Sequence, residues 1–111
     1  MRPRPAAASS FLFLTALMIS NSGSEAKPAR CFTSDEGSYP CAFVATGQDG
    51  SFKISAPGQP TYILTIDEPG VAFGFVNLGT RNISLPGRFL RSKTDPACWV
   101  NDSTHAKICA Q

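Results

Sequence analysis

The stretch ACWVNDSTHAKICA, residues 97–110, contains two of the four cysteines of this chain and its only histidine. Folding the stretch back about its centre places Cys98 opposite Cys109 and Trp99 opposite Ile108. Opposed residues of an antiparallel pair point to the same side, and successive residues alternate between sides. The two cysteines therefore share one face, and Trp99 and Ile108 share the other face, which we expect to be turned toward the core.

The middle of this stretch predicts a four-residue loop over residues 102–105. No Asn-Gly or Asp-Gly pair is present there to favour a two-residue turn. Asn101 and Ala106 then form the closing hydrogen-bonded pair, which leaves Cys98 and Cys109 at a non-hydrogen-bonded position, where side chains approach more closely. Because a disulfide needs β-carbons only about 3.8 Å apart, the stretch predicts a hairpin closed by a disulfide.

Metal binding and thiol catalysis are weaker interpretations of the same residues. Structural zinc sites favour cysteines two to four residues apart, whereas ten residues separate Cys98 from Cys109. A catalytic Cys-His pair needs a free thiol, which an exported location disfavours. We therefore expect no metal and no cofactor, and we expect His105 to be a solvent-exposed turn residue.

The other two cysteines, Cys31 and Cys41, enclose the segment FTSDEGSYP. An even number of cysteines in a small exported chain indicates disulfides. With Cys98 and Cys109 paired, Cys31 and Cys41 are left to pair locally. The alternative is a long-range link between the N-terminal segment and the C-terminal hairpin. A locally closed loop is expected either to hold down the N-terminal segment or to present a rigid recognition element.

The N-terminal residues MRPRPAAASSFLFLTALMISNSGSEA have the organisation of a secretory signal peptide. Arg2 and Arg4 precede a short apolar run, and small residues surround an expected cleavage site after Ala26. The apolar run is shorter than the roughly 18 residues needed to cross a bilayer. We expect residues 1–26 to be removed and residues 27–111 to form a single periplasmic or secreted domain without a membrane anchor.

Short runs of alternating polarity, separated by Gly- and Pro-containing turns, follow from residue 41 onward. This pattern predicts an all-β domain of six to eight short antiparallel strands, either a small sandwich or a partly open barrel, with two disulfides and little or no helix. The runs are residues 41–47, 51–56, 61–67, 71–77, 81–85, 88–92, 97–101 and 106–110.

The register of two hairpins predicts which side chains are buried. A two-residue turn at residues 49–50 places Ile54 opposite Ala45, with Phe43 and Phe52 on the same face. A loop centred on Pro69-Gly70 places Ile66 opposite Phe73 and Leu64 opposite Phe75. Ile63 and Val76 would pair on the opposite face as a second buried contact. The predicted core is Phe43, Ala45, Phe52, Ile54, Tyr62, Leu64, Ile66, Phe73, Phe75, Leu85, Trp99 and Ile108.

Nothing in the sequence indicates an enzyme. The acidic pairs Asp35-Glu36 and Asp67-Glu68 lie in turns, where neighbouring side chains diverge, whereas paired-carboxylate hydrolysis needs two acids that converge on one cleft. No G-x-S-x-G nucleophile motif or phosphate-binding loop is present. The 10 basic and 8 acidic residues nearly balance, so the overall charge favours no particular partner and no nucleic acid is expected.

One local excess of positive charge is a candidate site for polyanion binding. It consists of Arg81, Arg88, Arg91 and Lys93. A surface of this kind would suit lipopolysaccharide, an acidic glycan or a nucleic acid. The competing interpretation is ordinary basic decoration of edge strands, which discourages strand pairing between molecules.

The segments DEPGVAFGFVNLGTRNISLPG, DPACWVND and KICA resemble small exported proteins of Gram-negative bacteria. This resemblance covers nearly all of residues 27–111, implies a periplasmic location and supplies no activity or catalytic residue. We therefore expect a non-enzymatic module that binds or supports a component of the cell envelope, such as an envelope protein or an anionic glycan. The alternative is an inhibitor of a secreted protease or lysozyme, acting through the Cys31–Cys41 loop or the basic 81–93 segment.

Overall fold

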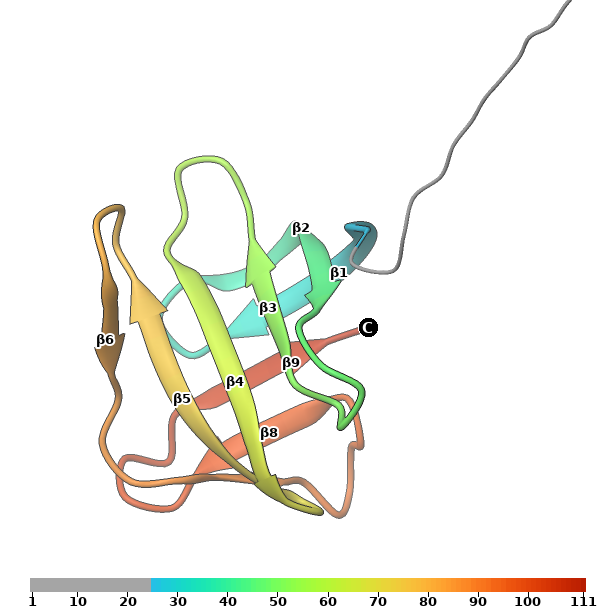
Figure 1. Cartoon of the computed structure of the whole chain (residues 1–111), viewed down its shortest axis with the longest axis vertical. Helices are drawn as coiled ribbons and strands as arrows, with labels where there is room; N and C mark the ends of the chain where they lie inside the picture. Colours follow the sequence, from blue (N-terminus) through green and yellow to red (C-terminus); the bar gives the residue numbers. More distant parts are fainter. Residues whose placement is uncertain (1–24) are drawn as a thin grey trace, which may run out of the picture.

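The computed structural model describes residues 25–111, which form a small barrel of antiparallel strands (Figure 1). These residues contain no helix, so none of them forms a helix that could cross a membrane. The predicted signal peptide lies outside the described residues except for its last two positions. The nine strands are β1 (Lys27–Thr33), β2 (Gly37–Ala45), β3 (Phe52–Ser55), β4 (Thr61–Glu68), β5 (Val71–Asn77), β6 (Asn82–Ser84), β7 (Phe89–Arg91), β8 (Cys98–Asn101) and β9 (Lys107–Ala110).

Eight of these strands close on themselves. They follow the order β4-β3-β2-β1-β9-β8-β7-β5, and the pairing of β4 with β5 joins the two ends. β6 is an additional strand that pairs with the second half of β5, whereas β7 pairs with its first two residues. In Figure 1, β4 and β5 lie in front of β1, β8 and β9. The all-β prediction with two disulfides is confirmed. The sequence left a sandwich or a partly open barrel of six to eight strands open, and the structure shows a closed barrel of eight strands with β6 as a ninth.

Alternate residues of each strand point into the barrel and form one core. Six members of the predicted core are buried, and Phe43, Ile66 and Leu85 pack against them while partly exposed; Ala45 is exposed. The six are Phe52, Ile54, Tyr62, Leu64, Trp99 and Ile108. β1 and the first residues of β2 add core members that the sequence analysis did not include, among them Cys31, Tyr39 and Cys41.

The β4–β5 hairpin contains a bulge that overturns part of the predicted core. The register shifts between Ile66 and Glu68, so Ile66 lies opposite Ala72 instead of Phe73. A shift of one residue sends every later side chain of β5 to the other face. Phe73 is consequently 43% exposed, and Phe75 lies on the same outer face.

The bulge also changes the expected second contact. Val76 lies opposite Tyr62 and packs against the core, whereas Ile63 lies opposite Phe75 on the outside. The predicted pairing of Ile63 with Val76 is therefore wrong.

The β2–β3 hairpin keeps its predicted faces although its loop is longer than predicted. Ile54 lies opposite Phe43, two residues from the predicted partner, Ala45. The Thr46 N–H donates to the Ser51 carbonyl at 2.9 Å, so four residues separate the closing pair. Because side chains repeat every two residues along a strand, a displacement of two leaves the buried face unchanged.

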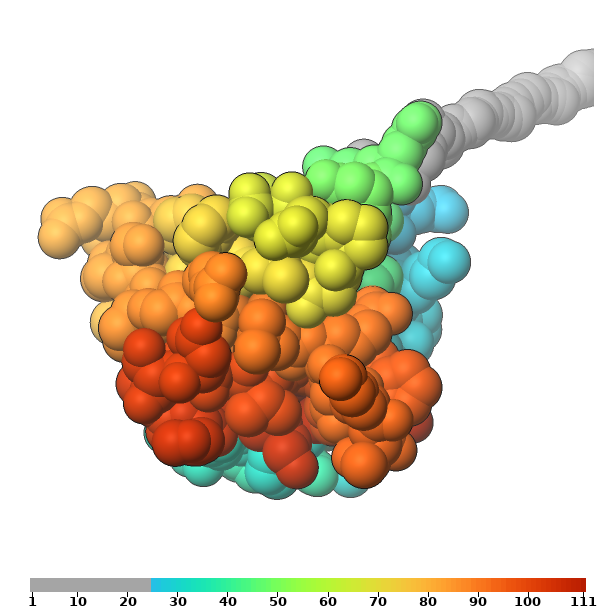
Figure 2. All heavy atoms as spheres, turned by 90° about the horizontal axis from the view of Figure 1, so that it is seen from below, coloured from blue at the N-terminus to red at the C-terminus, as the bar shows by residue number. Residues whose placement is uncertain are grey.

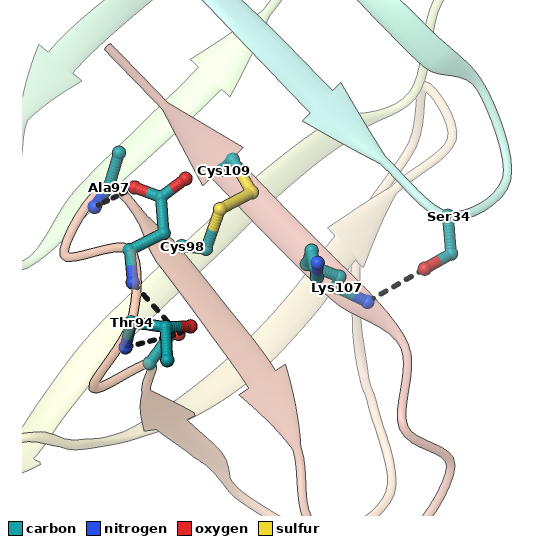
Figure 3. Close-up of a disulfide and its surroundings, with 8 residues drawn as sticks. Ser34, Thr94, Ala97, Cys98, Lys107 and Cys109 are labelled. Atoms are coloured by element: carbon teal, nitrogen blue, oxygen red, sulfur yellow. Dashed lines mark hydrogen bonds between the residues drawn. A yellow bond between two sulfur atoms is a disulfide. The ribbon is translucent and has the colours of Figure 1, made fainter.

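The β8–β9 hairpin has the predicted register. Cys98 lies opposite Cys109, Trp99 lies opposite Ile108, and the Asn101 N–H donates to the Ala106 carbonyl at 2.8 Å. The Cys98–Cys109 disulfide joins the two strands (Figure 3). Because Trp99 and Ile108 face the core, the disulfide lies on the outer side of the two strands, where both cysteines are nevertheless buried.

The Cys31–Cys41 disulfide links β1 to β2 on the inner face. The two cysteines are 1% and 9% exposed, and both belong to the core of the barrel. The local pairing predicted for all four cysteines is therefore confirmed, although one disulfide fills the core and the other lies outside it.

Candidate functional site

The outside of β4, β5, β7 and β8 carries apolar side chains where a solvent-facing sheet normally carries polar ones. Phe73 is 43% exposed and Leu90 is 38% exposed. Cross-strand pairing places Val71 opposite Leu90, and Leu90 opposite Val100, so these side chains form a continuous row. We call this surface the outer apolar face; it consists of Ile63, Val71, Phe73, Phe75, Leu90 and Val100.

Lysines lie at both ends of the outer apolar face. Lys53 on β3 lies opposite Ile63, and Lys107 on β9 lies opposite Val100. One acid, Glu68, lies beside the face, where it pairs with Val71 next to the β4–β5 turn. Apolar groups in the middle and charges at the margin are the usual arrangement of a protein interface.

The four cations predicted to bind a polyanion do not surround one point. Arg88 is paired with Asp102, with 3.3 Å between Nε and Oδ2. The Arg91 guanidinium lies over the buried Trp99 ring, 4.7 Å from its centroid. The backbone N–H of Arg91 donates a hydrogen bond to the carbonyl of Gly70, just before β5. Arg81 lies beyond the other end of β5, on the order of 20 Å away for a seven-residue strand.

Lys93, the fourth of these cations, is exposed between β7 and β8. The contacts of Arg88 and Arg91 thus join neither of them to another of the four cations. Polyanion binding by this segment stays a prediction.

The segment enclosed by Cys31 and Cys41 is a β-hairpin and not a protruding loop. β1 pairs along its full length with β2, from Lys27 opposite Phe43 to Thr33 opposite Gly37, and only a three-residue turn separates the two strands. The disulfide points into the barrel. This geometry corresponds to the structural role considered for the segment, which is to fix the N-terminal strand.

One end of the barrel opens into a hollow of about 420 Å³. The β1–β2 turn supplies Ser34 and Asp35, the β8–β9 turn supplies Thr104 and His105, and Leu85 and Phe89 lie deeper. Below it, a smaller hollow of about 70 Å³ reaches inward to Thr33 and Tyr62. We call the two hollows together the barrel mouth. Figure 2 shows the β8–β9 turn, in red, next to the blue-green β1–β2 region.

Two hydrogen bonds, one between backbone groups and one to the Ser34 hydroxyl, hold the two turns of the barrel mouth together. The Ser34 N–H donates to the Lys107 carbonyl at 3.0 Å, and the Lys107 N–H donates to Ser34 Oγ at 2.8 Å (Figure 3). The amide of the buried Asn101 shapes the β8–β9 turn, because its Oδ1 accepts the Ser103 and Thr104 N–H groups. The rim of the mouth is therefore preorganised on a disulfide-closed scaffold.

Beside the barrel mouth, Glu36 accepts two side-chain hydrogen bonds from the barrel interior. Tyr62 Oη donates to Glu36 Oε1 at 2.9 Å, and Thr33 Oγ1 donates to the same oxygen. Burial raises the pKa of Tyr62, and the hydrogen bond to the Glu36 carboxylate raises it further. Burial and the Glu36 charge also raise the pKa of Tyr39, whose buried hydroxyl has no hydrogen-bond partner among the described residues.

These two tyrosines should make the protein less stable in alkaline solution. An unfolded tyrosine loses its proton near pH 10, but the folded chain holds the protons of Tyr39 and Tyr62 to higher pH. Their stabilising effect is complete below about pH 10 and is lost as the pH rises through the folded pKa values, by about 1.4 kcal/mol per pH unit for each tyrosine.

Urea unfolding of Tyr62→Phe at pH 9, 10, 10.5 and 11 tests this prediction. Above pH 10, the free energy of unfolding should fall less steeply with pH for the variant than for the wild type. The two slopes should differ by about 1.4 kcal/mol per pH unit. At pH 7, it should be about 1 kcal/mol less stable because the bond to Glu36 is missing. Tyr39→Phe, which removes no hydrogen bond, is the matched control at neutral pH. Equal slopes for Tyr62→Phe and wild type would contradict the assignment.

The remaining chemistry-bearing residues are dispersed. His105 is exposed in the β8–β9 turn, as expected, and has a positive φ of 66°. Asp35 and Glu36 lie in the β1–β2 turn, whereas Asp67 and Glu68 lie beside the β4–β5 turn. Within residues 25–111, no three His, Cys, Asp or Glu side chains are grouped so that they could hold a metal ion.

No protein-family model, curated protein or solved structure matches this chain. Its class is therefore defined by the fold and the site: a closed β-barrel with two disulfides, an apolar outer face and an open mouth. Two disulfides and no free cysteine among the described residues indicate an oxidising environment outside the cytoplasm.

Proposed function

We propose that this protein is a non-enzymatic binding module of the periplasm or of the secreted fraction, and that it docks a protein of the cell envelope on its outer apolar face. The supporting observation is the exposure of Phe73 and Leu90 on a sheet surface whose inner side is already a complete core. Large exposed aromatic and aliphatic side chains at the centre of a patch are the usual anchors of protein interfaces.

The charges around the face favour a particular kind of partner. Lys53 and Lys107 at its two ends complement an apolar surface bordered by acidic side chains. The strands beneath are paired on both sides within the closed barrel, so the face is rigid before binding. A rigid surface loses little conformational entropy on association.

The proposal predicts that Phe73→Ser combined with Leu90→Ser abolishes capture of the partner. Immobilised oxidised protein is incubated with an envelope extract of the cells that produce it, and the retained proteins are identified by mass spectrometry. A partner bound by the wild type should bind the double variant at least about thirtyfold more weakly, because interface anchors contribute about 2 kcal/mol or more. Leu78→Ser, at an exposed apolar residue outside this face, is the matched control.

The variants must remain folded for the comparison to be meaningful. Both substitutions lie on the surface and should change the free energy of unfolding by about 0.5 kcal/mol or less each. Capture that persists in the double variant, or that is lost equally in Leu78→Ser, would contradict docking on the outer apolar face.

A further inference from the structure

The barrel mouth is separate from the outer apolar face and has the composition of a small-molecule site. Its outer hollow of about 420 Å³ falls within the range of roughly 300–1,000 Å³ typical of ligand pockets. A larger depression of about 740 Å³ lies around Pro28, Pro40 and Pro57, but it is shallow and lined mostly by alanine and proline, with Lys27 as its single ionisable residue among those described. The mouth instead combines an apolar interior with ionisable groups at the rim.

The interior of the mouth suits an apolar or aromatic group. Leu85 and Phe89 contribute to both hollows, and Tyr62 and Ile108 line the deeper one. Phe89 is 1% exposed and Tyr62 is 7% exposed, so their rings are fixed by the core and are not free to collapse into the space. The hollow is therefore part of the folded barrel, and a flat or short apolar group would enter without displacing the Phe89 and Tyr62 rings.

Negative charge predominates at the rim. Asp35 lines both hollows, and the adjacent Glu36 carboxylate is bonded to Tyr62 and Thr33, which line the deeper hollow. The positive charge of Arg88 is balanced by Asp102. Lys107 also lines the deeper hollow, but it belongs to the outward-facing row of β9, opposite Val100.

His105 is the other ionisable side chain at the rim. Of the two carboxylates, that of Asp35 lines the mouth and that of Glu36 acts from the neighbouring position. The same negative potential is consistent with the retained proton of Tyr62, which both Asp35 and Glu36 favour.

We infer that the barrel mouth binds a small organic amine, with its ammonium group beside Asp35 and its apolar group against Leu85 and Phe89. The carboxylate at position 35 makes no hydrogen bond to another described side chain, so it is available to a ligand, whereas Glu36 is held by Tyr62 and Thr33. Asp35 would contact the ammonium group, and Glu36 would contribute through its field.

Three probes with the same ring and different head groups test this inference: benzylamine, benzyl alcohol and phenylacetate. Each is titrated into isotope-labelled oxidised protein at pH 8 and fixed ionic strength, and amide and side-chain NMR shifts are followed. Benzylamine should shift the resonances of Asp35, Leu85 and His105 in a saturable manner and should bind more tightly than the other two. Tighter binding of phenylacetate, or equal binding of all three, would overturn the inference.

Two isosteric variants separate the role of Asp35 from a general effect of charge. Asp35→Asn should weaken benzylamine binding about fivefold, the effect of one exposed ion pair, and leave benzyl alcohol binding unchanged. Asp67→Asn makes the same change of charge beside the β4–β5 turn and should leave both affinities unchanged. Equal weakening by the two variants, or no weakening by Asp35→Asn, would overturn the placement of the amine in the barrel mouth.

Discussion

Replacing Gly74 with alanine should lower the free energy of unfolding by about 2–3 kcal/mol, a large share of the stability of so small a domain. A β-carbon at this position would lie 2.4 Å from Cε1 and 2.8 Å from Cδ1 of Phe89. The Phe89 ring is 1% exposed and packs in the core opposite Gly74, so an added β-carbon would force it out of its place in the core. Urea unfolding at pH 7, followed by Trp99 fluorescence, measures the effect.

A double-mutant cycle isolates this contact. If the cost comes from overlap with the Phe89 ring, Gly74→Ala should cost at least about 1 kcal/mol less in a Phe89→Leu background than in the wild type. Phe89→Leu alone is destabilising because it removes buried volume. An identical cost of Gly74→Ala in the two backgrounds would show that the absence of a side chain at this position serves another purpose.

Removing the inner disulfide should be at least as damaging as Gly74→Ala. The variant Cys31→Ala/Cys41→Ala is expected to lose about 3–5 kcal/mol, and Cys98→Ala/Cys109→Ala is expected to lose about 2–3 kcal/mol. The sequence separations of the two pairs are 10 and 11 residues, so the loss of loop constraint in the unfolded chain is nearly equal. The difference arises because the sulfurs of Cys31 and Cys41 lie within the barrel core and leave a cavity when removed.

Each cysteine pair is the control for the other in this comparison. Both variants are unfolded in urea at pH 7 without reductant, and their midpoints and slopes are compared with those of the wild type. Equal destabilisation would show that the inner disulfide acts only as a cross-link. Greater destabilisation by Cys98→Ala/Cys109→Ala would contradict the assignment of Cys31 and Cys41 to the core.

The β8–β9 hairpin could be predicted in full from fourteen residues because everything that determines it is local. The position of the loop, the polarity of alternate residues and the need of two thiols to meet all specify one register. The β2–β3 hairpin was predicted less well, since its loop has four residues between the closing pair instead of two. Its buried face was nevertheless correct, because the error was an even number of residues.

The β4–β5 hairpin could not be predicted because its bulge depends on contacts between distant segments. The Ile66 N–H donates to Ser51 Oγ at 2.8 Å, which fixes β4 to the end of the β2–β3 loop. Gly74 faces inward because the interior volume is taken by Phe89, which lies on β7. An alternating pattern alone assigns the larger Phe73 and Phe75 to the core, whereas the space inside a closed barrel admits only Ala72 and Gly74 there.

The candidate sites show the same division between local and distant determinants. The outer apolar face exists only because the bulge sends Phe73 and Phe75 outward, so no count of apolar residues could have located it. The barrel mouth joins the β1–β2 turn to the β8–β9 turn, about seventy residues further along the chain, through the bonds between Ser34 and Lys107. Arg81 is instead separated from Arg91 by the length of β5.

The sequence by itself determined the all-β class, the pairing of the four cysteines and the face of most strands that is buried. These properties follow from alternation with a period of two and from turns that close within a few residues. Only the tertiary structure decided that the sheet closes into a barrel, which aromatic residues fill it and which remain outside. Closure and filling depend on the volume enclosed by eight strands together, and that volume is a property of the whole chain and not of any one segment.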